Sequence, residues 1–581
     1  MRGFEIRFVL SFLAGLILLL LEFTLIRKHP RLRLLSGWTL SLLSIVCIVG
    51  TAWLVVNHVC FPLNLDLMEG TILQHVKRVA QLTPVYPPPS PDYVPFAYNP
   101  LYYVISVPFT WVFGMNLPTL RLVAIIGYVG SAVAVFLAVR DLTESRWWGL
   151  VGVGLFAASY QAMDVYLDTA HSDSWLLCCA LWGTYLIGIR QSFRWTMLGV
   201  MLLLASFWFK QHGALFVAAG LVYLTSAKGW RQSAVFWLTA GVLGPITYLY
   251  LGPALFGERF HYFTWAVPAA WQETNVQTLC RVLAFILKFH AMLAIGIAGT
   301  FCAKKVFILA KPNAWEFQLF TALLTGILGA MDCGSSDNVF IPMSTWVIVM
   351  GVASWHELSA RFAILKAWKV HLLALFISFG LVMFDPRMVA VSAESKRCYA
   401  DFIGFLKQLN GPVYAPSLGQ LPSDYRFYPG AHWVAIEDMI RGPGRDTRNH
   451  PLTREILDPV IHPSGTAYIL ENGPLDRFAF FRFLLDVFVL EKDLGDRFRS
   501  LGALPKRFDH GWPRYLYRYA PKQVRPMTSS MWENCWDMRF SASWVCTMLV
   551  NDTATRTYLE VQLCQPESST NKRAPREELV E

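Results

Sequence analysis

Charged residues are scarce in this chain. Lys, Arg, Asp and Glu make up 15% of its 581 residues, whereas hydrophobic residues make up 55%. A soluble globular protein carries roughly 25% charged residues, so this scarcity excludes one. Many separate apolar runs reach the roughly 20 residues that a helix needs to cross a bilayer. The chain is therefore predicted to be a polytopic membrane protein.

Two further patterns are absent. The 11 cysteines are scattered, with no CxxC pair and no Cys/His spacing typical of a metal site. Cys535, Cys546 and Cys564 gather near the C-terminus, where a disulfide can form if that end faces an oxidising compartment. We also find no internal repeat, although transporters often carry inverted repeats. The sequence thus offers no metal motif, and the missing repeat weighs against a transporter.

The apolar runs predict about 12 membrane spans. The first run, from Phe8 to Ile26, is long for a signal-peptide core, and no small-residue cleavage site follows it. It is therefore interpreted as a retained span. The predicted spans are 8–26, 34–57, 119–140, 149–166, 174–190, 195–209, 213–227, 234–255, 282–302, 316–332, 340–355 and 368–384.

The basic residues predict the orientation of these spans. One set of loops holds most of the Lys and Arg, and the positive-inside rule assigns such loops to the cytoplasm. This set comprises Arg27, Lys28, Arg31, Arg33, Arg140, Arg146, Arg190, Arg194, Lys228, Arg231, Lys304, Lys305, Lys311, Arg361, Lys366 and Lys369. The opposite loops hold only Lys77, Arg78, Lys210, Arg259 and Arg281. Cytoplasmic loops thus account for the excess of 50 Lys and Arg over 40 Asp and Glu, and no nucleic-acid partner is expected.

The long outer loop at 58–118 is predicted to hold interfacial helices. Residues 70–82 carry an apolar stripe at helical spacing, and Tyr86 to Pro95 is rich in proline. Asn99 to Phe113 is apolar and aromatic. Counting it as a span would reverse the sidedness of every later loop, so we predict a helix lying in the membrane interface, where its aromatic residues are favoured.

The composition changes after about residue 385, where charged residues, Gly and Pro become frequent. A helix at 393–409 and a strand at 412–415 predict a soluble domain. The fold class expected is an all-α polytopic membrane domain followed by a smaller C-terminal extracytoplasmic α+β domain. The predicted regions are an extra span and basic loop at 1–33, the membrane domain at 34–385, the soluble domain at 386–525, and a partly disordered tail at 526–581.

Polar residues at the outer ends of the spans are the candidates for chemistry. Ionisable groups at membrane depth are costly, so they usually pair or function. The predicted topology places all of them on one side, where they would line one cavity. The set comprises Asp66, Glu69, Asp168, His171, Asp173, Lys210, Gln211, His212, Glu258, Arg259, His261, Asp332, Ser335, Ser336, Asp337 and Asn338.

Simpler explanations exist for each candidate. Asp173 follows Ser172 and opens a span, so helix capping alone explains it equally well. Lys210 ends a span and could extend to the interface like any lysine there, although that does not require the polar Gln211 and His212 beside it. Asp66 and Glu69 are ordinary loop acids when taken singly, but their spacing places both on one helical face.

Several of these segments carry a family resemblance in chain order. The motifs are Asp66-Leu67-Met68-Glu69-Gly70, Thr83-Pro84-Val85-Tyr86, Tyr98-Asn99-Pro100-Leu101-Tyr102-Tyr103, His171-Ser172-Asp173-Ser174, Phe209-Lys210-Gln211-His212-Gly213 and Gly334-Ser335-Ser336-Asp337-Asn338. Together they resemble polytopic C-superfamily glycosyltransferases, in particular family 39 and its protein mannosyltransferase, aminoarabinose transferase and Rgt-like branches. The resemblance covers about residues 34–355.

The resemblance implies transfer of a sugar from a polyprenyl-phosphate donor to an acceptor outside the membrane, with inversion at the anomeric carbon. A first-loop carboxylate, Glu69 or Asp66, would be the base, and we expect the two to act jointly. Lys210 would meet the leaving phosphate, with Arg259 and His261 as further cations. The other residues expected to bind donor or acceptor are Asp173, Gln211, His212, His171, Tyr98 and Asn338.

The resemblance leaves other features open. Some relatives bind a divalent cation, Mg or Mn, between such acids and others do not, and no ligand spacing here decides the matter. The acceptor is a glycan, a lipid or a protein. The expected location is the cell (inner) membrane, with the site and the C-terminal domain extracytoplasmic. The alternative function is a transporter or flippase of a lipid-linked or small polar substrate.

Overall fold

The structure is a computed structural model. It describes residues 13–17, 20–21, 35–189, 192–272, 275–304, 312–332, 335–421, 430–443, 466–477, 481, 484–485, 487–502 and 512–520. Residues Met1–Asp537 form one compact unit and Met538–Glu581 a second one. Most of the predicted first span, several of the basic loop residues, the three C-terminal cysteines and the predicted tail lie outside the described residues.

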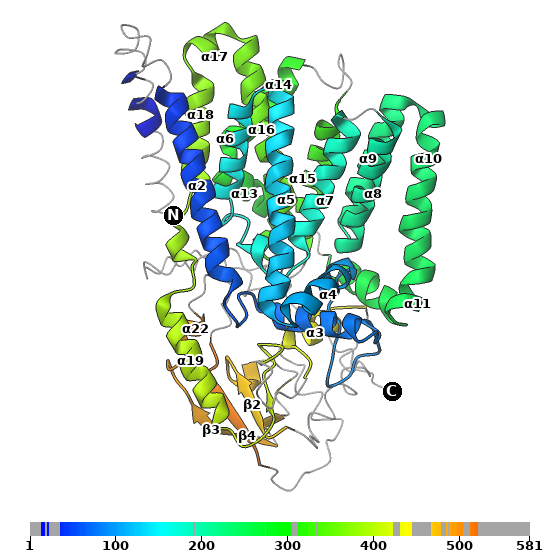
Figure 1. Cartoon of the computed structure of the whole chain (residues 1–581), viewed down its shortest axis with the longest axis vertical. Helices are drawn as coiled ribbons and strands as arrows, with labels where there is room; N and C mark the ends of the chain where they lie inside the picture. Colours follow the sequence, from blue (N-terminus) through cyan, green and yellow to red (C-terminus); the bar gives the residue numbers. More distant parts are fainter. Residues whose placement is uncertain are drawn as a thin grey trace, which may run out of the picture. The chain divides into compact units, whose positions relative to one another are not determined.

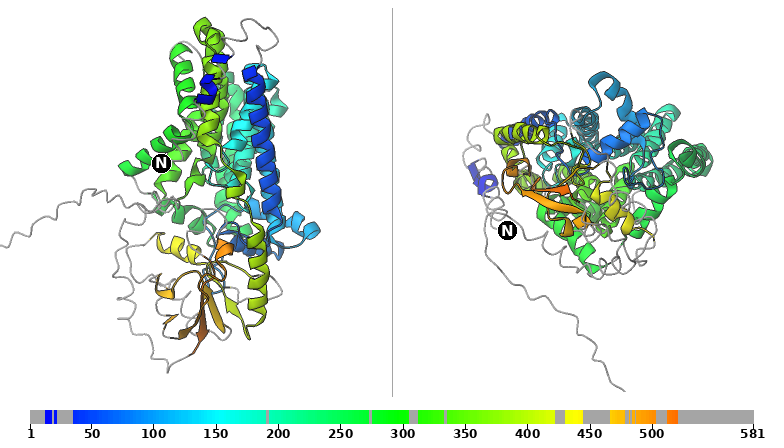
Figure 2. Two further views of the ribbon diagram at one scale, coloured as in Figure 1. Left: turned by 90° about the vertical axis from the view of Figure 1, so that its left-hand side faces the viewer. Right: turned by 90° about the horizontal axis from the view of Figure 1, so that it is seen from below.

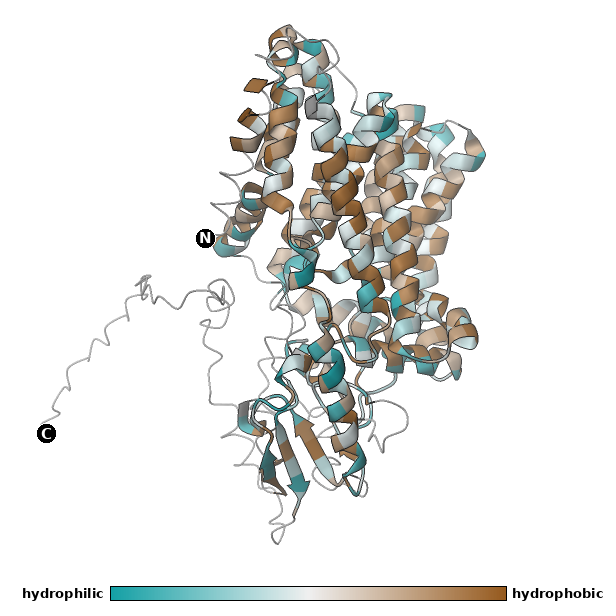
Figure 3. Cartoon of the chain, turned by 60° about the vertical axis from the view of Figure 1, so that its left-hand side comes forward, coloured by the Kyte–Doolittle hydropathy of each residue, from teal (hydrophilic) through white to brown (hydrophobic). Residues whose placement is uncertain are grey.

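The membrane domain is a bundle of apolar helices (Figure 1). Its main helices are α2 (Leu35–Val59), α5 (Leu117–Thr143), α6 (Arg146–Ala158), α7 (Asp173–Ile189), α8 (Phe193–Phe209), α9 (Gly213–Lys228), α10 (Trp230–Gly241), α13 (Val276–Phe289), α14 (Ala291–Lys304), α15 (Ala314–Met331), α16 (Ile341–Arg361) and α18 (Val370–Val382). Within the described ranges six helices are long and apolar enough to cross a membrane, or seven if one bent pair counts as a span. Figure 3 shows hydrophobic residues along the bundle helices and hydrophilic residues on α19 of the C-terminal domain.

Small residues let these helices pack closely. A Cβ at Gly183 of α7 would lie 2.9 Å from the carbonyl oxygen of Gly199 of α8, and a Cβ at Gly199 would lie 3.0 Å from the carbonyl oxygen of Gly183. Larger side chains would push the two backbones apart. Close backbone approach through glycine is typical of helix pairs in membranes, because lipid provides little hydrophobic drive for association.

Two predicted spans have the wrong bounds. The span predicted at 149–166 ends as α6 at Ala158, after which the chain turns and forms the short 3-10 helix η2 (Tyr166–Asp168). The span predicted at 282–302 is two helices, α13 and α14, which meet at His290 with a bend of 99°. Apolar composition alone does not show such a break, because both halves remain hydrophobic.

The first outer loop contains the two helices expected there. They are α3 (Glu69–Ala80) and α4 (Leu101–Phe113). The proline-rich connection between them pairs with the end of α11 (Gly252–Phe256) and the residues after it. The Tyr86 amide donates to the Phe256 carbonyl, and the Tyr86 carbonyl accepts from the Arg259 amide.

The C-terminal domain is α+β, as predicted. It contains α19 (Ala393–Lys407), α20 (Trp433–Ile440), α22 (Arg499–Gly502) and the strands β1 (Val413–Tyr414), β2 (Tyr468–Glu471), β3 (Phe488–Asp493) and β4 (Tyr515–Tyr519). Over the described residues the strands form one sheet in the order β1-β2-β4-β3. The β1–β2 pair is parallel and the other two pairs are antiparallel. The left view of Figure 2 shows this sheet beyond the lower ends of the long helices.

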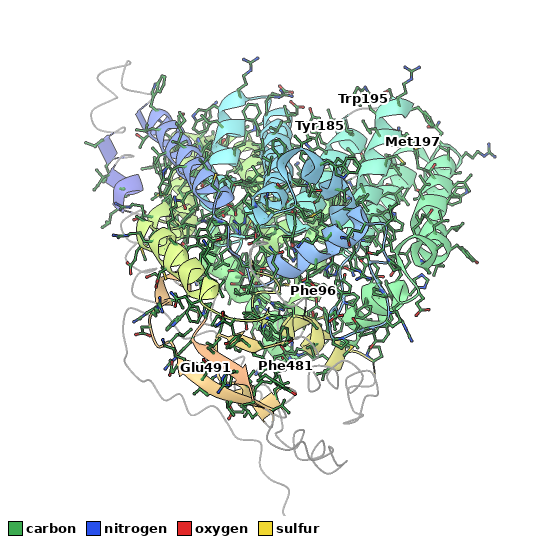
Figure 4. All side chains as sticks on the ribbon, turned by 60° about the horizontal axis from the view of Figure 1, so that its bottom comes forward. Phe96, Tyr185, Trp195, Met197, Phe481 and Glu491 are labelled. Carbon is green, nitrogen blue, oxygen red and sulfur yellow. The ribbon has the colours of Figure 1, made fainter. Side chains whose placement is uncertain are left out.

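The C-terminal domain shares its hydrophobic cores with the first outer loop. Phe61, Leu63 and Leu65 are buried in one core with α19 and β4 residues. Phe96 and Phe481, both labelled in Figure 4, belong to a second core that also contains α3 and α20 residues. Because apolar burial is the main favourable term in folding, the soluble domain and the acidic loop stabilise each other.

Gly70 shows how closely the two parts approach. A Cβ at Gly70 would lie 2.0 Å from the Leu418 carbonyl oxygen. Gly419 faces it with a φ of +66°, a conformation that glycine adopts at little cost. The glycine that ends the Asp66–Gly70 motif is thus required by the contact with the C-terminal domain.

Candidate active site

Asp66 and Glu69 lie at the turn into α3, and the structure places their carboxylates in different surroundings. The Glu69 amide donates to the Asp66 carbonyl (3.2 Å), and the Met68 amide donates to the Asp66 side chain at Oδ2 (3.0 Å). These bonds fix the start of the helix. Both side chains are buried, Asp66 at 1% exposure and Glu69 at 0%.

Glu69 is the anion of a buried ion pair. Arg121 of α5 donates from Nε to Oε1 (2.9 Å) and from Nη2 to Oε2 (2.5 Å). The amides of Ala170 (2.8 Å) and Leu65 (2.6 Å) also donate to this carboxylate. Burial by itself raises the pKa of Glu69, but the Arg121 charge and these hydrogen bonds outweigh burial and hold the pKa below its ordinary value of 4.5.

Arg121 also fixes the chain before the acidic motif. Its guanidinium donates to the carbonyls of His58 (3.2 Å), Phe61 and Leu63 (2.7 Å). Sequence reasoning missed this residue. The available signal was a single arginine at the outer start of an otherwise apolar predicted span, a position that usually requires a partner.

Asp66 has a different partner from Glu69. Tyr166 donates its hydroxyl hydrogen to Asp66 Oδ1 (2.9 Å). Tyr166 was also missed from sequence, because nothing in its local pattern distinguishes it from an ordinary aromatic at the end of a span.

Residues 166–173 form a segment that contacts Asp66, Glu69 and Asp173. Tyr166 reaches Asp66, the Ala170 amide reaches Glu69, and His171 reaches Asp173. Between them, Asp168 accepts from the Tyr160 hydroxyl and lies 2.8 Å from His58 Nδ1. His58 Nε2 in turn lies 2.7 Å from the Val389 carbonyl oxygen. Through these contacts the 166–173 segment connects the first outer loop with Val389, just before the C-terminal domain.

Asp173, His171 and Lys210 meet at the start of α7. Lys210 Nζ lies 2.8 Å from Asp173 Oδ1, and His171 Nδ1 contacts Asp173 Oδ2. All three side chains are at least nine-tenths buried. Lys210 is therefore buried against Asp173, and Asp173 has a lysine and a histidine as partners beyond any capping role.

Tyr98 covers this group. Lys210 Nζ lies 5.6 Å from the centre of the Tyr98 ring, a cation–π distance. The His171 ring packs edge-on to Tyr98 with centroids 4.9 Å apart, and edge-on to Tyr166 at 5.4 Å. Asp66, Tyr166, His171, Asp173, Lys210 and Tyr98 therefore form one connected cluster, which we call the acid–lysine cluster.

Other predicted site residues have different surroundings. Gln211 donates to the carbonyls of Ala97 and Thr264, both at 2.8 Å, and so joins the first outer loop to the α11–α13 region. His212 precedes α9, and burial together with Lys210 lowers its pKa to about 4. Both flank the acid–lysine cluster without an ion pair or hydrogen bond to it among the described contacts.

Three predicted residues lie outside the cluster. Arg259 is exposed, and its amide pairs with the Tyr86 carbonyl. His261 Nε2 lies 3.0 Å from the Tyr248 carbonyl oxygen. Asn338 accepts from Ser336, whose hydroxyl also donates to Asp164 (2.5 Å). In the described contacts none of the three touches Asp66, Asp173 or Lys210.

Two further acids, Asp332 and Asp438, have raised pKa values. Burial raises the pKa of Asp332 to about 7, although Lys210 and a hydrogen bond from Gln272 lower it. Burial likewise raises the pKa of Asp438, on α20, to about 8. Burial raises the pKa of Tyr98 well above its usual value, and the nearby carboxylates of Asp438, Asp173 and Asp66 raise it further. Asp332 and Asp438 thus lie within electrostatic range of the cluster.

The cluster brings two carboxylates, a lysine and a histidine to one place. Asp66, His171 and Asp173 are each at most 2% exposed. Carboxylates can accept a proton, and a lysine can bind an anion. Within the described ranges no group of three or more His, Cys, Asp or Glu side chains is arranged to hold a metal ion.

Comparisons with known proteins give structural neighbours only. No protein-family model matches the chain, and no curated protein matches it. ArnT from Cupriavidus metallidurans, solved bound to undecaprenyl phosphate, is similar over 85% of this chain and 100% of that one, with 12% identity and a TM-score of 0.47. Its apo structure gives the same TM-score over 99% of that chain. The Archaeoglobus fulgidus oligosaccharyltransferase, in complex with Zn and sulfate, is similar over 77% and 69% of the two chains, with 11% identity and a TM-score of 0.38.

The polytopic helical domain with a smaller C-terminal α+β domain, which the sequence predicts, is the fold observed.

Proposed function

We propose that this protein is a membrane glycosyltransferase that moves a sugar from a polyprenyl-phosphate donor to an acceptor hydroxyl, with inversion. The observation that carries the proposal is the acid–lysine cluster, where the Asp66 carboxylate and the buried Lys210 lie at the same ends of the bundle helices and are joined through Tyr166, His171 and Asp173. The sequence motifs that build this cluster are those of the family resemblance. The different partners of the two first-loop acids support a different role for each.

Asp66 is the proposed base. In the reaction the acceptor oxygen attacks the anomeric carbon, the bond from that carbon to the phosphate oxygen breaks, and the acceptor proton passes to Asp66. A positioned base commonly contributes roughly 10²–10⁴-fold. One carboxylate suffices for inversion, because no covalent glycosyl intermediate forms.

Glu69 has a positioning role in this proposal. Its carboxylate already binds Arg121 and two backbone amides, and its pKa is lowered by these contacts. A carboxylate so strongly held as an anion is a poor proton acceptor. Glu69 instead fixes the turn that carries Asp66.

Lys210 is the proposed partner of the leaving phosphate. As the phosphate leaves, it gathers negative charge, and a nearby cation stabilises that charge. Lys210 directly follows the apolar helix α8 and lies next to Asp173, which suits a phosphate whose lipid tail stays in the bilayer. His171 and Tyr98 complete the surroundings of this lysine.

The proposal names the acceptor and the sugar only by their chemical class. The acceptor is a glycan, a lipid or a protein, and the sugar is a hexose or a pentose. The proposed location is the cell (inner) membrane, with the acid–lysine cluster facing outward. The proposal assigns no role to a divalent cation, Mg or Mn. The described side chains form no group of three or more metal ligands.

The test is transfer by the full-length protein in liposomes from a panel of polyprenyl-phosphate hexoses and pentoses, followed by release of polyprenyl phosphate. Wild type should release it from at least one donor, and Asp66→Asn should slow release by about 10²-fold or more. A Lys210→Gln variant should lose most use of the donor. Full activity in Asp66→Asn would remove Asp66 as the base.

The matched control is Asp493→Asn in the C-terminal domain. Asp493 is an exposed acid that pairs with Arg514, remote from the cluster in the chain's contacts. Its loss should leave release unchanged. If no donor of the panel is used by wild type, the proposed reaction is wrong.

A further inference from the structure

The turn before Tyr166 holds two residues in a left-handed backbone conformation. Asp164 has a φ of 60° and Val165 a φ of 58°. The Val165 amide donates to the Tyr160 carbonyl (3.0 Å), and the Asp164 amide donates to the Gln161 carbonyl (3.0 Å). This is the hydrogen-bond pattern of a helix end that usually carries glycine. Here an aspartate and a β-branched valine take that place, so the turn is strained.

Two contacts help to hold this strained turn. Ser336 donates its hydroxyl hydrogen to Asp164 Oδ2 (2.5 Å). The Val165 side chain is buried in the main core of the helix bundle. Strained conformations persist only where the surrounding structure fixes them, and they gather at functional sites. The fold therefore keeps this turn in a conformation that its own residues disfavour.

The segment that carries Ser336 is fixed against α13. Arg281 of α13 donates from Nη1 to Ser335 Oγ (2.9 Å) and from Nη2 to Asp337 Oδ1 (3.0 Å). These two bonds hold the residues on either side of Ser336. The serine hydroxyl is thus presented to the turn from a segment that is itself anchored.

The turn leads directly to the hydroxyl that contacts Asp66. Tyr166 follows Val165, is buried, and donates to Asp66 Oδ1 (2.9 Å). The Thr169 hydroxyl donates to the Tyr166 carbonyl (3.0 Å), which fixes the backbone after the turn. Because a tyrosine side chain is a rigid ring with few rotamers, its backbone position determines where the hydroxyl lies. Contacts therefore run without a break from Ser336 to Asp66.

We propose that Tyr166 is a positioning residue for the base Asp66. The turn at 164–165, held by Ser336, sets the place of the tyrosine hydroxyl. This inference rests on the proposed glycosyl transfer. The hydrogen bond from Tyr166 favours the charged form of the carboxylate, which is the form that accepts a proton. The tyrosine keeps its own hydrogen, so the step moves one proton, from the acceptor hydroxyl to Asp66.

The first test is the pH profile of polyprenyl phosphate release by the full-length protein in liposomes, with a donor that wild type uses. Tyr166→Phe removes the hydrogen bond to Asp66 and keeps the ring. Because the lost bond favours the charged carboxylate, the acid limb of kcat/KM should move to higher pH by about one unit. The KM for the donor should stay unchanged. An acid limb that does not move overturns the inference, whatever happens to the melting temperature.

The matched control is Tyr185→Phe. Tyr185 is also a buried tyrosine that donates to an aspartate, at Asp141 Oδ2 (2.7 Å). It lies roughly 18 Å along α7 from Asp173. Its loss should leave the acid limb in place. Equal shifts in the two tyrosine variants would reflect the loss of any buried hydroxyl and would overturn the role of Tyr166.

The second test concerns the turn. Ser336→Ala removes the hydrogen bond to Asp164, so the strained turn can relax and the Tyr166 hydroxyl can move away from Asp66. The acid limb should move in the same direction as in Tyr166→Phe. Ser336→Thr keeps a hydroxyl and should retain the wild-type profile. The double variant of Ser336→Ala and Tyr166→Phe should shift no further than Tyr166→Phe alone, because both changes act on one hydrogen bond.

Ser500→Ala is the control for this second test. Ser500 also donates its hydroxyl hydrogen to a carboxylate, that of Glu394 (2.6 Å), but on the surface of the C-terminal domain. Its loss should leave the profile unchanged. A wild-type profile in Ser336→Ala, or shifts that add in the double variant, would overturn the part assigned to the turn.

The role of Tyr166 and the proposed reaction fail in different ways. Transfer by wild type together with an unmoved acid limb in Tyr166→Phe removes the positioning role and leaves the reaction in place. A wild-type protein that uses no donor overturns the reaction and the positioning role with it.

Discussion

Glu69 and Asp66 stand three residues apart, yet the fold gives them different partners. Glu69 meets an arginine, whereas Asp66 meets a tyrosine hydroxyl. Breaking a buried ion pair by removing one partner costs about 3–5 kcal/mol. We therefore expect Glu69→Gln to lower the melting temperature of the purified protein strongly.

The pH dependence of this stability has a defined sign. The native pKa of Glu69 lies below its ordinary value of 4.5. Stability from the Glu69 carboxylate is therefore fully present above pH 4.5 and is lost as the pH falls through the lowered native pKa. Melting temperatures of wild type and Glu69→Gln between pH 3 and 7 should differ most at neutral pH and converge in acid. A constant difference over that range would contradict the ion-pair account.

The residue types of the site were largely predictable from sequence, but their pairings were not. Asp66, His171, Asp173, Lys210 and Tyr98 were expected to gather, and the described contacts join them. Arg121 and Tyr166 were not expected, because their partners lie 52 and 100 residues away in the chain. A single sequence shows local spacing, whereas contacts at such separations depend on how the helices pack.

At the scale of the element, most helices were predictable because hydrophobicity marks them. The exceptions are positions where the backbone bends or turns instead of continuing a helix. The bend at His290 and the turn after Ala158 both lie within apolar sequence. The position of α20 depends on Pro91, Phe96 and Trp271, which are distant in the chain, so local pattern gave no indication of it.

The contact between α3 and the 415–421 segment leads to a prediction about glycine. Gly70→Ala places a methyl group 2.0 Å from the Leu418 carbonyl oxygen, so the C-terminal domain must shift. Overpacking of this kind typically costs about 1–3 kcal/mol. We expect a lower melting temperature and reduced transfer.

The matched control is Gly404→Ala in the middle of α19. A Cβ at Gly404 meets nothing within 4 Å, and alanine is favoured over glycine inside a helix by about 0.5–1 kcal/mol. This variant should be slightly more stable than wild type. Equal effects of the two substitutions would show that the close approach at Gly70 is not required.

Helix α20 also gives a pH prediction. Burial raises the pKa of Asp438 to about 8, with Arg441 lowering it and the nearby acids Glu437 and Asp332 raising it further. An acid with a raised native pKa contributes stability below its unfolded pKa, and that stability is lost as the pH rises through about 8. Asp438→Asn should therefore gain melting temperature relative to wild type between pH 5 and 8. Asp493→Asn should show no such gain.

At the scale of the whole chain, charge is unequal between the two ends of the bundle. Arg140, Lys228, Lys304 and Arg361 lie in the last turns of α5, α9, α14 and α16. Asp173 begins α7, and Lys210 directly follows α8. The structure adds Arg121 to the second end, but this arginine is neutralised by Glu69. The positive-inside rule therefore still assigns the first end to the cytoplasm.

This assignment predicts which residues an impermeant reagent reaches. Lys396 of α19 and Arg361 of α16 are both exposed, and they belong to opposite ends. In a cysteine-free background, a membrane-impermeant maleimide should label Lys396→Cys on intact cells and should label Arg361→Cys only after the membrane is opened. The reverse pattern would place the acid–lysine cluster on the cytoplasmic side. The proposed donor phosphate and acceptor would then have to bind on that side as well. Labelling of both positions on intact cells would instead favour a protein that opens to each side in turn, as a transporter does.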